Sequence, residues 1–346
     1  MAEAGSGGSP MRVLVTGGSG FLGSHVAAAL AKAGHGVVSY DMAAPGPEAL
    51  VTLAASEGSD VVHATGQTTD LARLMDVCRT ERIEAIVHSA GIVGLETSLA
   101  QPGATYHTNI TGMVNVCEAA RQLGMARLVY LSSNAAYHGG DGSPLKETDP
   151  VFSVVQGNPA GHYGTTKMAC EAIGLAYASF HALDVLALRV TAVYGLGMRT
   201  PMFIKPMVEG AVLGRPVRFA TGGPMKRDYT YVPDCARAVV RALAVPAPAE
   251  GAQRVFNVAA GQATAAAEVA RIVRQVVPGA DIEIGDALSP LEEVNARMRA
   301  SLDISAARAV LGWAPEFTLE QGIRDYAERY RAFAGASGSH PKGQAA

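Results

Sequence analysis

A tyrosine and a lysine four residues apart are the side chains of this sequence best suited to catalysis. Tyr163 and Lys167 lie in the segment YGTTK, and Ser133 stands thirty positions before the tyrosine. On a helix, positions i and i+4 share a face, so both side chains can point into one pocket. An ammonium beside a phenol favours the phenolate, which can take a proton from an alcohol near neutral pH, as oxidation to a ketone requires. A surface helix would fit an isolated YxxxK equally well, so this interpretation depends on the rest of the chain.

The elements that must position these side chains form an alternating strand and helix pattern. Apolar runs at 11–16 and 36–40 flank a segment with helical character at 21–33, which predicts a βαβ unit. The runs are apolar throughout, as in parallel strands covered by helices on both faces. Further strands are expected at 60–63, 85–88, 127–131 and 185–189, and further helices at 70–81, 109–123 and 163–180.

After Val190 the alternation ends and loops rich in Gly and Pro appear. We expect this half to form a smaller substrate-binding region, with a strand at 229–232 that returns to the first half. The predicted fold class is α/β, with a parallel sheet. A disordered leader is expected at 1–10 and a disordered tail at 335–346.

Composition argues against several partners. The 346 residues carry a net charge of −3 with no basic run, so no nucleic acid partner is expected. No apolar run approaches the ~18 residues that would span a membrane, and the first ten residues lack the apolar segment of a signal peptide. The four cysteines form no C-x-x-C pair, which predicts neither a disulfide framework nor a metal site and fits the cytoplasm.

The loop GGSGFLG at 17–23 joins the first strand to the first helix. It contains G-x-G-x-x-G, whose glycines permit a tight turn and let a pyrophosphate approach the helix N-terminus. Asp41, at the end of the second strand, is placed to bond the adenosine ribose and would repel a 2′-phosphate. The loop and this acid predict a dinucleotide site that prefers NAD, although an aspartate at a strand end also fits an ordinary turn.

Several motifs occur in a characteristic order: the glycine loop, HSAG at 88–91, Asn109, Ser132-Ser133, YGTTK and RDY at 227–229. Over about residues 11 to 330 the chain resembles the extended short-chain dehydrogenase/reductase family, specifically its NAD-dependent sugar epimerase/dehydratase branch. The resemblance implies a Rossmann doubly wound parallel sheet with a smaller C-terminal α/β substrate-binding domain. The expected divisions are an NAD-binding Rossmann domain at 11–188 and a substrate-binding region at 189–331, with 226–260 partly returning to the Rossmann domain. The resemblance also implies that Ser133, Tyr163 and Lys167 are catalytic, with Ser133 bonding the reacting hydroxyl. Asn109 could instead be a helix N-cap. The residues that the resemblance places on NAD are Gly17, Gly20, Phe21, Leu22, Asp41, Gln67, Thr68, Ala90, Gly91, Asn109, Ser132, Tyr163, Lys167 and Val190.

Within this branch, the segments at 188–195, 197–203 and 225–232 are most similar to nucleotide-diphosphate-sugar 4-epimerases, in particular the type that acts on uronic sugars. The resemblance implies that Arg227 contacts the substrate phosphate and that Arg199 lies near the sugar or its phosphates, although either could be a solvated loop residue. The implied substrate contacts are Ser133, Asn134, Arg199 and Arg227.

Three positions depart from the family pattern. Gln67 stands where an aspartate commonly contacts adenine, and Ala192 stands where many members carry asparagine or threonine. Glu293 falls near the place of an arginine that often binds the nucleotide diphosphate. Arg297 or Arg299 could take over that role.

The expected reaction is a transient oxidation: Tyr163 removes a sugar hydroxyl proton, NAD accepts the hydride, and the hydride returns to the other face of the keto sugar. A dehydrogenase acting on a free sugar, sugar acid or other alcohol is the alternative. A dehydratase is disfavoured because Asn134 and Ala135 replace an Asp-Glu pair, and a silent NAD-binding regulator is disfavoured because Tyr163 and Lys167 are present. By analogy with relatives, a homodimer is expected.

Overall fold

The computed structural model describes residues 9–55, 61–140, 142–297 and 300–336. Most of the expected leader and tail therefore lies outside the described residues. Within them, no helix combines the length and the apolar character needed to cross a membrane.

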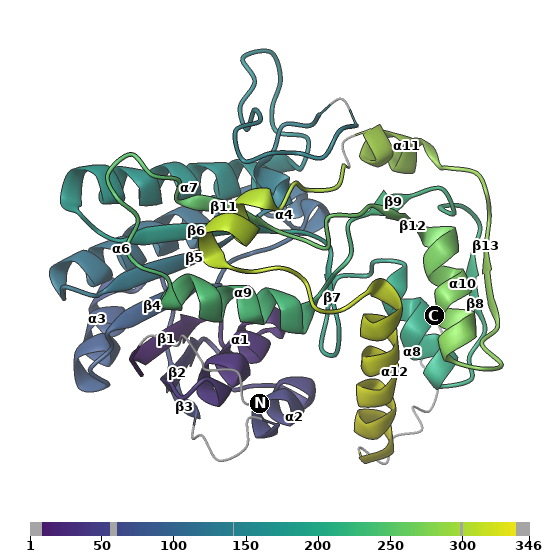
Figure 1. Ribbon diagram of the computed structural model, residues 1–346, viewed down its shortest axis with the longest axis horizontal. Coiled ribbons are helices and arrows are strands. Elements are labelled where there is room, and N and C mark those ends of the chain that lie inside the picture. The colour runs from purple at the N-terminus through teal and green to yellow at the C-terminus, as the bar shows by residue number, and fades with distance from the viewer. Residues whose placement is uncertain (1–8, 56–60, 141, 298–299, 337–346) are drawn as a thin grey trace.

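A parallel sheet forms the centre of the described chain, with seven strands in the order β3-β2-β1-β4-β5-β6-β11 (Figure 1). Its chain order reverses between β1 and β4, so the predicted doubly wound sheet is confirmed. The strands β4 and β5 are buried along their whole length because helices cover both faces. The strand bounds are β1 Arg12–Thr16, β2 Gly36–Asp41, β3 Val61–Thr65, β4 Ala85–His88, β5 Arg127–Ser133, β6 Val185–Val190 and β11 Val255–Val258.

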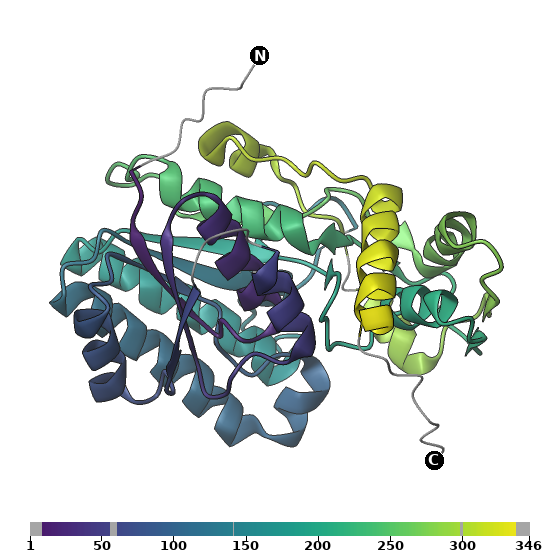
Figure 2. The ribbon, with the colours of Figure 1, turned by 90° about the horizontal axis from the view of Figure 1, so that it is seen from below.

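Two helical layers enclose this sheet (Figures 1 and 2). One core combines Leu30 of α1 (Phe21–Lys32) with Val239 of α9 (Val232–Ala244) and the nearby Trp313. The other combines Leu74 of α3 with Met113 of α6. The helices of this second layer are α3 Leu71–Thr80, α6 Gly112–Gln122 and α7 Gly161–His181, and α2 Pro47–Ala54 packs against α1.

A separate apolar core unites α8 (Ile204–Val212), α10 (Ala266–Val276) and α12 (Leu319–Ala336), which lie to one side of the sheet (Figure 2). Short strand pairs join the segments around it. The remaining elements are α4 Leu95–Ala100, α5 Pro102–Tyr106, the π-helical turn η1 His107–Thr111, the 3₁₀ turn η2 Asn134–Ala136, β7 Val193–Tyr194, β8 Val217–Phe219, β9 Lys226–Arg227, β10 Thr230–Tyr231, β12 Thr264–Ala265, β13 Ile282–Ile284, α11 Pro290–Arg297 and the π-helical turn η3 Ala307–Leu311.

The strand expected at 229–232 does not return to the central sheet, so this prediction is wrong. Only β10 forms there, and it pairs with β7 outside the central sheet. Because Pro233 occupies the first turn of α9, the chain becomes helical at Val232. The segment that returns to the central sheet is β11, which pairs with β6, and α9 then packs on α1.

Candidate active site

The glycine loop leaves the carboxyl end of β1 and leads into α1. Gly17 has a φ of +71°, and a Cβ there would lie 2.8 Å from the Ala90 nitrogen. A Cβ on Gly23 would overlap the Gly17 carbonyl oxygen. These positions require glycine because the loop folds against its own backbone and against the end of β4. The helix begins after Gly20 without a side-chain cap, so its first amide groups fit a pyrophosphate.

Asp41, at the end of β2, is hydrogen-bonded to this loop. Its carboxylate accepts hydrogen bonds from the Ser19 nitrogen at 3.1 Å and the Met42 nitrogen at 2.7 Å. The next loop is held by Tyr40, whose hydroxyl donates to the Gln67 carbonyl at 3.0 Å. Gln67 itself is exposed, whereas Thr68 is buried. The structure thus gathers Gly17, Gly20, Phe21, Leu22, Asp41, Gln67 and Thr68 around the ends of β1, β2 and β3.

Asn109 joins the loop after β4 to helix α7. Its Nδ2 donates to the Ile92 carbonyl at 3.0 Å and to Thr166 Oγ1 at 2.9 Å, and its Oδ1 accepts from the Ile92 nitrogen at 2.8 Å. The N-cap alternative is wrong, because Asn109 lies inside the continuous helical run α5–η1–α6. In the same loop, a Cβ on Gly91 would lie 2.9 Å from Asn109 Oδ1, and the Ala90 nitrogen donates to Thr16 Oγ1 at 3.3 Å.

Helix α7, which carries Tyr163 and Lys167, packs against β5, which ends at Ser133, and against the turn η2 that follows it. The Lys167 ammonium donates to the Leu131 carbonyl at 2.7 Å and lies 5.7 Å from the centre of the Tyr163 ring. Ser133 Oγ accepts from the Ala135 nitrogen at 3.1 Å, so the turn η2 holds its side chain at the strand end. Val190, at the end of β6, pairs in register with Ser133.

His88 lies buried next to this group. Burial, reinforced by the charge of Lys167, lowers the pKa of His88 to about 3. Its Nδ1 is 2.8 Å from Thr16 Oγ1, which joins the ends of β4 and β1. His88 is therefore neutral near pH 7.

Arg227 is half-buried, and burial lowers the pKa of its guanidinium. Within the described residues it has no carboxylate partner, and its side chain donates only to the Lys226 carbonyl at 3.3 Å. The adjacent Asp228 is buried and accepts from the Gly261 nitrogen at 3.1 Å and the Leu302 nitrogen at 3.0 Å. A desolvated arginine without an acidic partner is suited to an anionic ligand such as a phosphate.

Arg199 lines a cavity of about 290 Å³, which the glycine loop and the start of α2 also line and whose lining does not include Ser133, Tyr163 or Lys167. Its side chain is exposed and makes no hydrogen bond or ion pair with any other residue of the described ranges. The lining residues are Ser19, Gly20, Phe21, Gly46, Glu48, Ala49, Gly197, Met198, Arg199 and Lys205.

The residues that depart from the family pattern lie in different parts of the structure. Ala192 has a φ of +37°, a left-handed conformation in which asparagine is better tolerated than alanine. Glu293 is exposed on α11. Arg297 ends this helix, and Arg299 lies outside the described residues, so their role as a phosphate handle stays a prediction.

Three residues that position the site were missed from the sequence: Glu171, Thr166 and Tyr130. Ser132 donates to the Glu171 carboxylate, Thr166 bonds Asn109, and Tyr130 lies 4.7 Å from the Lys167 ammonium. The spacing offered one signal, since Glu171 follows Lys167 by four positions on the same helix. In the part of the chain that the structure describes, no cluster of three histidine, cysteine or acidic side chains could hold a metal ion.

Comparison with known proteins agrees with this geometry. The model of the NAD dependent epimerase/dehydratase family matches residues 13–259. The chain is 32% identical over 327 residues to a UDP-glucose 4-epimerase of Mycolicibacterium smegmatis, covering 93% of this chain and 99% of that protein. It is 27% identical over 321 residues to a UDP-glucuronate 4-epimerase of Thermodesulfobacterium geofontis, covering 90% and 93%.

A solved structure shares the whole architecture. The UDP-glucose 4-epimerase of Thermus thermophilus in complex with NAD superimposes with a TM-score of 0.76 at 27% identity, over 93% of this chain and 99% of that one. The resemblance inferred from the motifs is confirmed, and so is the expectation of NAD as cofactor. The chain belongs to the NAD-dependent epimerase/dehydratase family, within the extended short-chain dehydrogenases/reductases.

Proposed function

We propose that the protein inverts the C4 hydroxyl centre of a nucleotide-diphosphate sugar, with a uronic sugar as the first candidate. One observation carries the proposal: Lys167 of α7 binds the Leu131 carbonyl near the carboxyl end of β5, two residues before Ser133, and lies 5.7 Å from the centre of the Tyr163 ring. This is the sheet edge where β1 runs into the glycine loop. In doubly wound sheets this edge is where dinucleotides and their substrates bind.

The chemistry assigned to these side chains is proton transfer at one hydroxyl. Tyr163 takes the proton of the C4 hydroxyl as the carbon is oxidised and returns it when the carbon is reduced. Ser133 hydrogen-bonds the same oxygen, and the charge of Lys167 stabilises negative charge on the phenol oxygen. Bound NAD supplies the hydride acceptor and donor. The centre inverts because the keto sugar presents its other face before reduction.

The anionic half of the substrate is assigned to the arginines. Arg227 is the stronger candidate, because its desolvated guanidinium has no acidic partner among the described residues. Arg199, in the cavity beside the glycine loop, is placed to contact phosphates rather than the reacting carbon. Asn134 follows Ser133 in the turn η2 and is assigned to the sugar. The similarity to enzymes of UDP-glucose and UDP-glucuronate supports UDP as the nucleotide.

Two measurements test this function. The purified protein is denatured and its nicotinamide content measured by absorbance and mass; near-stoichiometric NAD is expected, because an epimerase must retain its cofactor. UDP-glucose and UDP-glucuronate are then incubated with the protein, and the C4 epimers are separated by chromatography. A protein that retains no NAD and makes free NADH from a sugar panel would instead be the alternative dehydrogenase.

We also propose a homodimer. Apolar side chains are exposed on α4, α5 and α7, which pack against one another. Leu99 is 56%, Tyr106 37%, Leu175 37% and Phe180 82% exposed. Burial of these side chains against a second copy would remove them from water. Sedimentation of the protein, with and without Leu175→Asp, tests this assembly.

The division into a Rossmann domain at 11–188 and a substrate-binding region at 189–331 also stays a proposal. It is supported by the separate core around α8, α10 and α12. A cytoplasmic location is proposed because Cys78, Cys117, Cys170 and Cys235 are all free thiols in the structure.

A further inference from the structure

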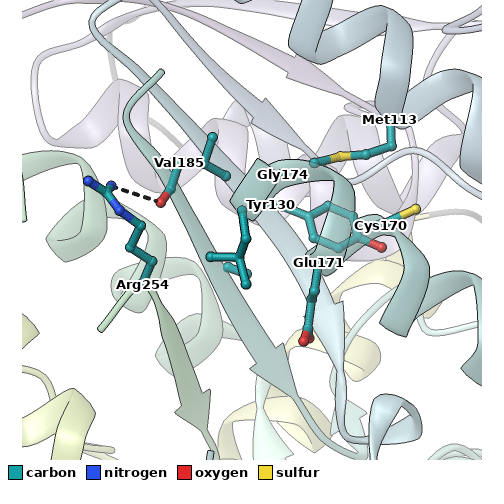
Figure 3. Close-up of a pocket in the computed structure, with 9 residues that line it drawn as sticks. Met113, Tyr130, Cys170, Glu171, Gly174, Val185 and Arg254 are labelled. Carbon is teal, nitrogen blue, oxygen red and sulfur yellow. Dashed lines mark hydrogen bonds between the residues drawn. The ribbon is translucent and has the colours of Figure 1, made fainter. Parts of the chain in front are cut away.

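A buried ion pair connects helix α7, which carries Tyr163 and Lys167, to strand β6, the neighbour of the strand that ends in Ser133. Glu171 follows Lys167 by one turn on α7, and its carboxylate forms an ion pair with Arg189 of β6. The guanidinium Nη2 lies 2.7 Å from Oε2 and Nε lies 3.0 Å from Oε1. The two side chains are 4% and 5% exposed. Glu171 and Tyr130 line the same narrow space between α7 and β5 (Figure 3), which has no room for a water molecule.

The pair is also tied to the strand that ends in Ser133. The Ser132 hydroxyl donates to the Glu171 carboxylate, and Ser132 pairs in register with Arg189 across β5 and β6. Lys167 makes a second connection between α7 and β5 through the Leu131 carbonyl. The helix bearing Tyr163 is therefore attached to β5 at two consecutive residues immediately before Ser133.

Arg189 extends the network to the segment after Ser133. Its guanidinium lies 4.4 Å from the centre of the Tyr137 ring, and its Nη1 donates to the Glu147 carbonyl at 3.2 Å. Tyr137 in turn donates to Asn257 Oδ1 at 2.7 Å. The Arg189 guanidinium therefore also contacts the residue that ends η2, the turn that holds the Ser133 side chain.

A buried ion pair is a poor device for stability alone, because two apolar side chains of similar volume often stabilise a fold equally well or better. Its directional hydrogen bonds do fix the distance and angle between the elements that it joins. Here the pair joins the helix with the proton-transfer group to β6, and the Ser132 hydroxyl joins the same carboxylate to β5, the strand with the hydroxyl-binding group. A misplacement of about 1 Å between reacting groups can lower a rate by about 10²-fold.

We propose that Glu171 and Arg189 are positioning residues, which set helix α7 against strand β5 so that Tyr163 and Ser133 reach the same substrate hydroxyl. The inference rests on the proposed function. It assigns to this pair no contact with substrate or cofactor.

The test compares three variants with a matched control. Glu171→Gln leaves Arg189 buried without its charge partner, and Arg189→Met does the reverse. The double variant Glu171→Met/Arg189→Met removes both charges and restores apolar packing. The control is Asp184→Asn, because Asp184 pairs with Arg127 at 2.6 Å in a second ion pair at the opposite end of β5.

For Glu171→Gln we expect kcat to fall about 10- to 100-fold, with KM for the sugar nucleotide and the NAD content unchanged. Glu171→Gln and Asp184→Asn should lower the melting temperature by similar amounts, but Asp184→Asn should keep its kcat. The double variant should regain the melting temperature while its kcat remains low. If kcat returns together with stability in the double variant, or if folded Glu171→Gln turns over normally, the pair is only structural and the inference fails.

A crystal structure of the double variant gives a reading that does not depend on activity. The Lys167 ammonium should leave the Leu131 carbonyl, and Tyr163 should shift relative to Ser133. Unchanged positions of these side chains would overturn the inference. A wild-type protein without epimerase activity would refute the proposed function, while this structural comparison would still decide the role of the pair.

Discussion

Replacing Asn109 by alanine separates cofactor retention from general stability. The side chain makes three hydrogen bonds, two to the Ile92 backbone and one to Thr166 Oγ1, and it is 5% exposed. At about 1 kcal/mol for each lost bond, the free energy of unfolding should fall by about 3 kcal/mol. With an unfolding entropy of roughly 0.7 kcal/mol per kelvin for a chain of 346 residues, the melting temperature should fall by about 4 °C.

The functional effect should exceed this thermal effect. Asn109 Oδ1 lies against Gly91, so its loss should loosen the loop after β4. This loop contacts the glycine loop where Ala90 lies against Gly17. We expect Asn109→Ala to lose most of its bound NAD during purification, as measured by the nicotinamide released on denaturation.

Asn257→Ala is the matched control. Asn257 is also fully buried, and its side chain also makes three hydrogen bonds, to Tyr137, Leu145 and Asp303. It should show the same fall in melting temperature and keep stoichiometric NAD. Equal retention of NAD by the two variants would refute the role assigned to Asn109.

Three further outcomes follow from the site. Tyr163→Phe should lower kcat by at least about 100-fold and keep NAD bound, because only proton transfer is lost; full turnover would contradict the assignment. Arg227→Met should raise KM for a UDP-sugar by about 10-fold or more through loss of a charged hydrogen bond, whereas exposed Arg218→Met should not. Burial raises the pKa of Asp228 to about 6, above its ordinary value of 3.8, so its contribution to stability is largest below pH 4 and is lost as the pH rises through 6. Between pH 4.5 and 7 the free energy of unfolding of the wild type, measured in urea, should fall by about 2 kcal/mol more than that of Asp228→Asn; parallel curves would contradict this.

The parts of the fold that local pattern encodes were predictable. Apolar runs of strand length, helical segments between them and glycine at the first turn indicated the strands as far as β6 and the helices α1, α3, α6 and α7, but not α2, α4 or α5. Asp41 followed from its place at the end of β2. The motif YGTTK lies on α7 with Lys167 directed to the end of β5. These features depend on residues close together in the chain, so the sequence displays them directly.

Two wrong expectations show where local pattern is insufficient. The apolar run at 229–232 resembled a strand of the central sheet, but Pro233 starts α9 and β11 takes that place. Asn109 resembled a helix cap, but the helical run begins earlier, at Pro102, which places its carboxamide against Ile92 and Thr166. In both cases the competing element was specified by residues outside the segment.

The sequence by itself determined the family, the NAD fold and the chemistry that Tyr163 and Lys167 can perform, because glycine geometry and helical spacing are local properties. The tertiary structure alone decided that Arg199 lies beside the glycine loop, that Arg227 lacks an acidic partner among the described residues, and that Glu171 joins α7 to β5. These relations involve side chains far apart in the chain. Their hydrogen bonds and desolvation exist only after the sheet has brought β1, β5 and β6 to one edge.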